Sequence, residues 1–195
     1  MKVSIIIPGY RTEYLSDLFH SINRQSQKPH EVLYEHTLEI NAAEKINNLA
    51  KIATGDAILV ISDDDRISLD YIEKTSKAMD HGWDIVYTDM LKFGKTIGAF
   101  VQPASDYTEK NFKASTVPWM TSLIRKTTFD EAGGWDPEQM YQDYDFYYRC
   151  FKNGATGHHI KEPLFEYRIH ETAGSFNMDH DRARRLMKKK HPEIL

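Results

Sequence analysis

The sequence predicts an α/β fold in which a doubly wound, mostly parallel sheet carries helices on both faces. Two apolar runs support this prediction, at residues 3–7 and 57–61, because each is rich in β-branched residues and ends abruptly at proline, glycine or charged residues. Continuous apolar runs of this kind are typical of strands buried on both faces of a parallel sheet. Helical periodicity between the strands favours right-handed crossovers that cover both faces.

The first half of the chain alternates regularly between strands and helices. Its helices are indicated by apolar residues three or four positions apart, such as Leu15, Leu18 and Ile22, and by glycines at their ends. In chain order we expect a strand at 3–7, a helix at about 13–25, a strand starting at 31–34, a helix at 42–53, a strand at 57–61, a helix at about 69–79 and a strand at 84–88.

The second half is less regular. Glycines and a proline interrupt residues 91–116, which predicts an edge hairpin followed by a loop. Helices are expected at 121–132 and 143–152, because both segments end at glycine, and a late strand is expected at 164–169.

The composition indicates one globular domain with no nucleic-acid partner. The chain has 195 residues and a formal net charge of −4, whereas nucleic-acid-binding proteins present a basic surface. Cys150 is the only cysteine, which favours a reducing compartment. No apolar run approaches the roughly 20 residues that span a bilayer, and no export signal is expected. We therefore expect a cytoplasmic protein, with residues 1–177 as one domain and 178–195 as a basic tail.

Three consecutive aspartates, Asp63, Asp64 and Asp65, follow the central strand. Open α/β sheets bind ligands at the carboxyl ends of their strands. Crowded carboxylates repel one another, and burial adds a desolvation penalty unless a cation neutralises them. A divalent cation with a bound phosphate would do so. The alternative interpretation is a solvated acidic loop in front of the helix that starts near Leu69.

Several short motifs follow one another in a characteristic order. They are VSIIIPGYR at 3–11, ATGDAI at 53–58, SDDD at 62–65, LDYI at 69–72, FDEAGGWD at 129–136, QDYDF at 142–146 and EPLFEYRIH at 162–170. Together they resemble the motifs of family 2 glycosyltransferases with the GT-A fold, from Val3 to about Ser175. The resemblance implies a Rossmann-like GT-A domain in which residues 1–90 bind the nucleotide sugar and residues 91–177 bind the acceptor.

The resemblance also implies a reaction. Such enzymes transfer a sugar from a nucleoside diphosphate, usually with inversion, to an acceptor hydroxyl. A UDP-sugar is the expected donor, and a glycan or a lipid-linked molecule is the expected acceptor. A hard cation, Mn²⁺ or Mg²⁺, would stabilise the charge of the leaving diphosphate. Its expected ligands are Asp63, Asp64, Asp65 and His170, and which of the aspartates contacts the metal is left open.

Further site residues follow from the same resemblance. Pro8, Tyr10 and Arg11 would border the nucleotide, Asp63 and Asp64 would face the donor, and Arg168 would contact the diphosphate. Arg168 and His170 are two positions apart on a predicted strand and should share a face.

Asp143 is the expected general base, because an inverting displacement needs one carboxylate to take the acceptor proton. The alternative role for Asp143 is a helix N-cap. Asp145 should point to another helix face and is expected to be structural. Gln142 and Trp135 are expected at the acceptor, and the family usually has glutamate at the position of Gln142. Trp119 is expected there as well, although core packing is the default role of a tryptophan.

The chain departs from the family after its second strand, where an acidic turn that reads the nucleobase is missing. Glu35 is the nearest candidate for that role. The trimmed region and Gln142 keep an alternative open, namely a catalytically weak or inactive domain that binds a nucleotide sugar or a glycan. The basic segment 179–191 is interpreted as a solvated helix, with peripheral contact to an anionic membrane as the alternative.

Overall fold

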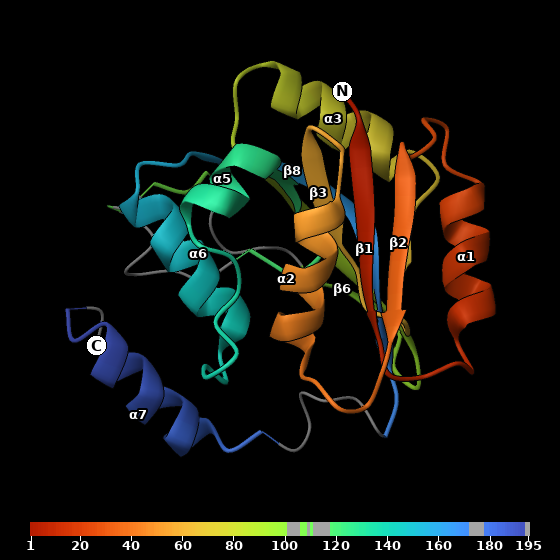
Figure 1. Cartoon of the computed structure of the whole chain (residues 1–195). Coiled ribbons are helices and arrows are strands. Elements are labelled where there is room, and N and C mark those ends of the chain that lie inside the picture. Colours follow the sequence, from red (N-terminus) through yellow and green to blue (C-terminus); the bar gives the residue numbers. More distant parts are fainter. Residues whose placement is uncertain (101–105, 109, 111–117, 172–177, 194–195) are drawn as a thin grey trace.

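The computed structural model describes residues 1–100, 106–108, 110, 118–171 and 178–193. Within them, helices lie on both faces of an eight-stranded sheet, which confirms the predicted α/β fold (Figure 1). The elements are β1 (Val3–Gly9), α1 (Leu15–Asn23), β2 (Glu31–His36), α2 (Ala42–Ile52), β3 (Ala57–Val60), β4 (Arg66–Ile67), α3 (Tyr71–Asp80), β5 (Ile85–Gly94), β6 (Gly98–Phe100), β7 (Leu123–Arg125), α5 (Lys126–Glu131), α6 (Gln142–Lys152), β8 (Gly157–Ile169) and α7 (His180–Lys190).

The longer strands pair in parallel. β1 lies between β2 and β3 and is parallel to both, and β5 is parallel to β8 from Ile85 to Gly94. The short strands β4, β6 and β7 pair antiparallel with their neighbours. The sheet order is β2-β1-β3-β7-β5-β8-β4, with β6 on β5. β1 and β3 therefore end side by side, at the edge where the acidic residues follow.

Alternate residues of β1 enter separate cores, because successive strand side chains point to opposite faces. Ile6 belongs to the core that contains α2 and α6. Ile5 and Ile7 belong to the core that contains α1 and α3. All three isoleucines are fully buried. The apolar runs of the sequence thus form the doubly covered strands that they predict.

The second half corrects one expected element. Residues 123–125, expected within a helix, form β7, and helix α5 occupies only Lys126–Glu131. β7 fills the gap between β3 and β5, so a tertiary pairing overrides the local helical pattern. The predicted edge hairpin is present as β5 and β6, but residues 101–105, 109 and 111–117 of the expected loop lie outside the described residues.

The late strand and the tail agree with the predictions in kind. Residues 164–169 form the second half of the longer strand β8, and most of the basic tail forms α7. In the described part of the chain, no helix has the length and apolar character needed to cross a membrane.

Candidate active site

Asp63 lies where the loops after β1 and β3 meet. Its buried carboxylate accepts hydrogen bonds from the backbone N–H groups of Tyr10 and Arg11, the latter at 2.6 Å. The parallel pairing of β1 with β3 brings these segments together although they are more than fifty residues apart in sequence. Asp63 therefore fixes the loop that carries Tyr10 and Arg11 to the acidic residues.

The carboxylate of Asp64 lies between a histidine and an arginine. His170 Nε2 is 2.8 Å from Asp64 Oδ2, and Arg11 Nη1 is 3.3 Å from the same oxygen. The Arg11 guanidinium is also 3.4 Å from Asp63 Oδ1, so one cation bridges two carboxylates. The structure thus brings together four residues that the sequence placed at the donor or at the metal.

Asp65 and Arg168 form the next contact along this edge. Asp65 accepts a hydrogen bond from the backbone N–H of Arg168 at 2.9 Å, and Arg168 Nε donates to the carbonyl of Asp64 at 2.7 Å. Burial and the neighbouring Asp64 charge hold the pKa of Asp65 well above its usual range, although the Arg168 contacts act against this shift. Negative charge is therefore only partly compensated here.

The Arg168 side chain is held from several directions. Its Nη2 is 2.7 Å from Asp17 in α1, and its guanidinium lies 4.3 Å from the centre of the Tyr14 ring and 4.4 Å from that of Phe93. Such contacts orient a guanidinium and limit its movement. Asp17 is a contributor to this edge that the sequence reasoning missed, and an acidic residue on an exposed helix carries no local signal of that role.

Asp143 and Asp65 line the same cavity, of about 490 Å³. Asp143 comes from the first turn of α6, and burial raises the pKa of its carboxyl, although a hydrogen bond from the Tyr144 N–H opposes this shift. The cavity is further lined by Ser62, Met90, Lys92, Trp119, Met120, Thr121, Phe165, Tyr167 and Ile169. It thus joins an acid from each half of the chain, within mostly apolar walls.

The residues predicted to contact the acceptor or the nucleobase, Trp135, Gln142 and Glu35, are not among those that line this cavity. Trp135 is 3% exposed and stacks on Phe146 in the core, so its ring has no open face for an acceptor. Gln142 lines a different hollow, next to α7. Glu35 is paired in register with Pro8 at the end of β2. Trp135 and Gln142 thus do not line the cavity that contains Asp143, whereas Trp119 does.

Lys45, which the sequence did not single out, is a buried lysine next to Tyr10, one of the residues expected to border the nucleotide. Its Nζ donates to the carbonyl of Gly9 at 2.5 Å and lies 3.2 Å from the centre of the Tyr10 ring. Burial lowers its pKa, while the nearby Glu35 and Asp63 charges oppose that shift. The sequence could have indicated this burial, because Lys45 is four positions before the apolar Leu49 and so lies on the buried face of α2.

α2 also binds the turn that precedes α6. The Asn47 side chain donates to the Trp135 carbonyl at 2.7 Å and accepts from the Trp135 N–H at 2.8 Å. Gly134 has φ +72°, and a Cβ there would lie 2.4 Å from Asn47 Oδ1. Position 134 therefore requires glycine both for its backbone conformation and for the close approach of Asn47.

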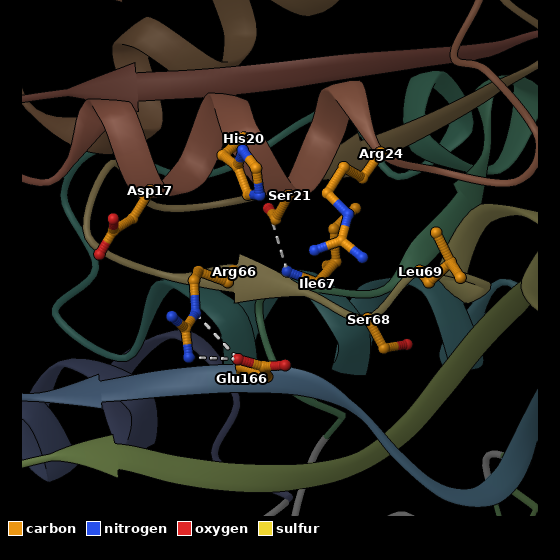
Figure 2. A pocket seen from close by; sticks show the side chains of 9 residues that line it. All are labelled: Asp17, His20, Ser21, Arg24, Arg66, Ile67, Ser68, Leu69 and Glu166. Atoms are coloured by element: carbon orange, nitrogen blue, oxygen red, sulfur yellow. Dashed lines mark hydrogen bonds and ion pairs between the residues drawn. The ribbon is translucent and has the colours of Figure 1, made fainter.

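A second hollow, of about 300 Å³, lies between α1 and β4 (Figure 2). Arg66 and Glu166 pair across its floor at 2.7 Å, and Asp17 lines it from α1. None of the predicted site residues is among those that line it in the described part of the chain. Its charged groups mostly neutralise one another, and we assign it no role in the chemistry.

The donor atoms at the edge are suited to a hard divalent cation, since they are carboxylate oxygens and one imidazole nitrogen. Of the four residues expected to bind a metal, Asp64 and His170 have side chains in direct contact, at 2.8 Å. Asp63 is directed to backbone N–H groups and Asp65 to the Arg168 N–H. Among the described residues, no group of three or more histidine, cysteine, aspartate or glutamate side chains is arranged to hold a metal ion.

Comparisons with known proteins place the chain beside glycosyltransferases. No protein-family model matches the chain. A Bacillus subtilis (strain 168) protein described as the uncharacterized glycosyltransferase YwdF is 28% identical, over 78% of this chain and 69% of that protein.

Solved structures show the same fold. The S. aureus TarS 1–349 structure in complex with UDP-GlcNAc has a TM-score of 0.77 and 15% identity, covering 99% of this chain and 67% of that one. The TarS 1–349 complex with UDP has a TM-score of 0.68 and 17% identity, covering 87% of this chain and 61% of that one. The chain thus has the fold of the matched part of TarS and spans about two thirds of the TarS 1–349 structures.

Proposed function

Because the chain shares this fold, we propose that it is an inverting, metal-dependent glycosyltransferase. In this proposal it transfers a sugar from a UDP-sugar to a hydroxyl of a glycan or of a lipid-linked acceptor. The observation that carries the proposal is the cavity shared by Asp65 and Asp143. Transfer needs the donor diphosphate and the general base for the acceptor at one cavity. Asp65 comes from the half of the chain proposed to bind the donor, and Asp143 from the half proposed to bind the acceptor.

The donor would lie along the edge where β1 and β3 end. Pro8, Tyr10 and Arg11 leave β1 there, and their loop is fixed by Asp63. Arg11 and Arg168 supply guanidinium groups, which suit phosphate oxygens. The TarS structures with UDP and UDP-GlcNAc support a uridine nucleotide as the first donor to test.

Asp64 and His170 would be the protein ligands of Mn²⁺ or Mg²⁺. Ions of this class often take only one or two protein ligands and complete their coordination with phosphate oxygens and water. Two adjacent side chains and an incoming diphosphate fit that pattern. When bound, the ion would act as a Lewis acid that stabilises charge on the leaving nucleoside diphosphate.

Asp143 would accept the proton of the acceptor hydroxyl. Its raised pKa brings it closer to the working pH, which improves a general base as long as it remains ionised. The apolar side chains of Met90 and Phe165 restrict water in the cavity, and Trp119 offers an aromatic surface for a sugar ring. General-base catalysis of this kind contributes about 10²–10⁴-fold to the rate.

A binding module without turnover is the second candidate, and one contact favours it. The Arg11 guanidinium already bridges Asp63 and Asp64, so the protein itself supplies a cation at the position proposed for the donor and its metal. Such a domain would hold a nucleotide sugar or a glycan through the same residues and would leave the donor intact.

Nucleotide release separates the two candidates. The full chain is incubated with a panel of UDP- and GDP-sugars with and without Mn²⁺, and with Asp143→Asn as the control. An enzyme releases UDP from one donor only when Mn²⁺ is present, and Asp143→Asn abolishes the release. Metal-dependent UDP binding without release would establish the binding module. If the chain neither binds UDP nor releases it from any donor, both candidates are refuted.

The proposed location is the cytoplasm, with peripheral membrane contact as the open alternative. Burial raises the pKa of the single thiol, Cys150, to about 12, so the thiol stays protonated and unreactive. A membrane-bound acceptor would be compatible with either arrangement.

A further inference from the structure

The C-terminal helix α7 is docked on α6 through a buried carboxylate. Asp145 has no exposed surface, and its two oxygens are shared between two elements. Its Oδ2 accepts from Arg149 Nε at 2.9 Å and Nη2 at 2.7 Å, within α6. Its Oδ1 lies 2.7 Å from His191 Nε2 and 2.9 Å from Lys190 Nζ, at the end of α7. One oxygen of Asp145 therefore has all of its described partners in α7.

The charge of Asp145 depends on this docking. Burial opposes ionisation of the carboxyl, but hydrogen bonds from Lys190, His191 and Arg149 outweigh it and hold the pKa below its usual range. A buried carboxylate that loses part of its partners is strongly destabilised. Without α7, the first turn of α6 would keep Arg149 alone and would have to move Asp145 toward water.

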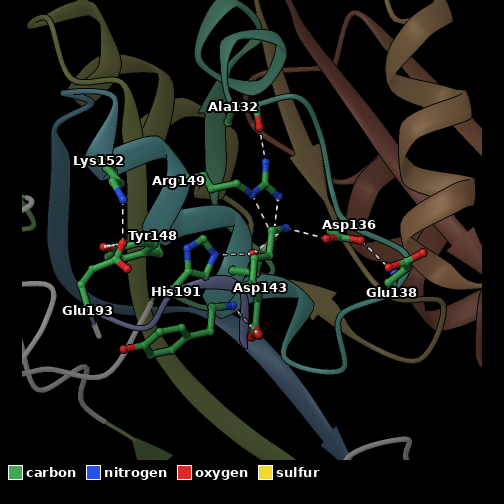
Figure 3. A network of polar contacts seen from close by, with 12 residues as sticks. Ala132, Asp136, Glu138, Asp143, Tyr148, Arg149, Lys152, His191 and Glu193 are labelled. Carbon is green, nitrogen blue, oxygen red and sulfur yellow. Dashed lines mark hydrogen bonds and ion pairs between the residues drawn. The ribbon is translucent and has the colours of Figure 1, made fainter. Parts of the chain in front are cut away.

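Further contacts of α7 reach both the end of α6 and the turn before it (Figure 3). Glu193 accepts from the Tyr148 hydroxyl at 2.7 Å and from Lys152 Nζ at 2.6 Å. Lys190 Nζ is also 2.5 Å from Asp136, in the turn that follows Trp135. Ala183 and Met187 of α7 are buried. α7 thus joins the two segments that carry α6 into position.

The same turn of α6 carries Asp143 on another face. Residues two positions apart on a helix point about 200° apart, because each residue advances the helix by about 100°. Asp145 points toward α7, and Asp143 lines the cavity that also contains Asp65. Because both residues belong to one helical turn, a displacement of Asp145 also displaces the carboxylate of Asp143.

We propose that Lys190 and His191 are positioning residues, which act through Asp145 to hold the Asp143 carboxylate at the reaction cavity. This inference rests on the proposed function for its effect on turnover, but not for its effect on α6. It also gives the basic tail a role that sequence alone did not indicate, because Lys190 and His191 both contact the buried Asp145.

Hydrogen–deuterium exchange of the full chain tests the structural half. The double variant Lys190→Met/His191→Leu removes both α7 partners of Asp145, and Lys189→Met is the matched control on the exposed side of the helix. We expect the amides of residues 144–147 to exchange at least tenfold faster in the double variant and unchanged in the control, with β1 and β3 unaffected. Unchanged exchange at 144–147 would overturn the proposal, and so would faster exchange throughout the sheet.

Kinetics test the positioning half, with the donor from which the wild-type chain releases UDP. We expect the double variant to lose at least tenfold in kcat, with the donor KM within twofold of wild type, because the donor edge is on β1 and β3. His191→Gln, which keeps an N–H donor, should retain more activity than His191→Leu. A kcat within twofold of wild type, or a parallel loss in donor KM, would overturn the positioning role. If the wild-type chain turns over no donor, the proposed function fails, and the exchange experiment still decides whether α7 holds α6.

Discussion

Two clusters of polar side chains in this protein each contain a buried aspartate, and the pKa values of these aspartates are shifted in opposite directions. At the sheet edge, burial and the charge of Asp64 hold the pKa of Asp65 above its usual range. At the α6–α7 junction Asp145 is as deeply buried, yet its pKa is lowered, because hydrogen bonds from Lys190, His191 and Arg149 together outweigh the desolvation. Burial of an acid therefore does not identify a ligand site. The balance of its partners decides whether its pKa is raised, as for Asp65, or lowered, as for Asp145.

Substitution of the acid at the shared cavity should give the largest effect. We expect Asp143→Asn to reduce nucleotide release by about 10²–10⁴-fold, the range for loss of a general base. Thermal stability should be unchanged or higher, because a carboxyl with a raised pKa is destabilising when ionised. The exposed Asp130→Asn is the control. Nucleotide release within threefold of wild type would remove Asp143 from the mechanism.

The comparison predicts that the two clusters respond differently to loss of a charge. Asp145→Asn should lower the free energy of unfolding by about 3 kcal/mol, because it leaves Arg149, Lys190 and His191 without their anion. Asp64→Asn should change it by less than about 1 kcal/mol, because it relieves repulsion within the triplet while it removes contacts to Arg11 and His170. Urea unfolding measures both. Equal losses would show that the sheet-edge cluster is also structural.

For ligand binding we expect the opposite order, with a larger effect from Asp64→Asn than from Asp145→Asn. Asp64→Asn is expected to weaken Mn²⁺-dependent UDP binding by at least tenfold in titration calorimetry, through loss of a charged ligand. The Asp145→Asn variant, measured at a temperature where it is folded, should bind UDP as the wild type does. Normal Mn²⁺-dependent binding by Asp64→Asn would contradict the proposed donor edge.

The turn between α5 and α6 offers a smaller, matched test. Gly134→Ala should destabilise the protein by about 2–3 kcal/mol, since it combines backbone strain at positive φ with a clash against Asn47. Gly133→Ala has a similar φ of +77° but an open space around its Cβ, so about 1 kcal/mol is expected. Equal effects in thermal unfolding would show that the Asn47 side chain can move away from a Cβ at position 134 without loss of stability.

The pH dependence involves both acids, and stability and kcat should both fall as the pH is lowered, through different carboxyls. Asp145 has a lowered folded-state pKa, so its stabilising contribution is present above its unfolded pKa of about 3.9 and disappears as the pH falls through the folded value. Asp143 has a raised pKa, so kcat should increase with pH through a value above the ordinary aspartate range. Stability and kcat profiles from about pH 3 to 8 test both, and a kcat profile without an acidic limb would contradict the assignment of the base.

The fold was predictable from sequence to a large extent, and the site in part. The apolar run at 57–61 and the helical spacing around Leu18 reflect local periodicity, and both correspond to elements of the structure. β7 was missed because three residues complete a gap between distant strands. Trp135 was expected at the acceptor because a tryptophan can stack on a sugar ring, although core packing is its default role, and the packing against Phe146 shows that the default applies.

The sequence by itself determined the order of strands and helices and the position of the aspartates after a central strand, because these depend on residues close together in the chain. Only the tertiary structure decided which acids share a cavity and which are neutralised. Asp64 meets His170 across 106 positions, and Asp145 meets His191 across 46. The charge state of a buried acid depends on partners brought to it by folding, and a pattern of neighbouring residues does not contain them.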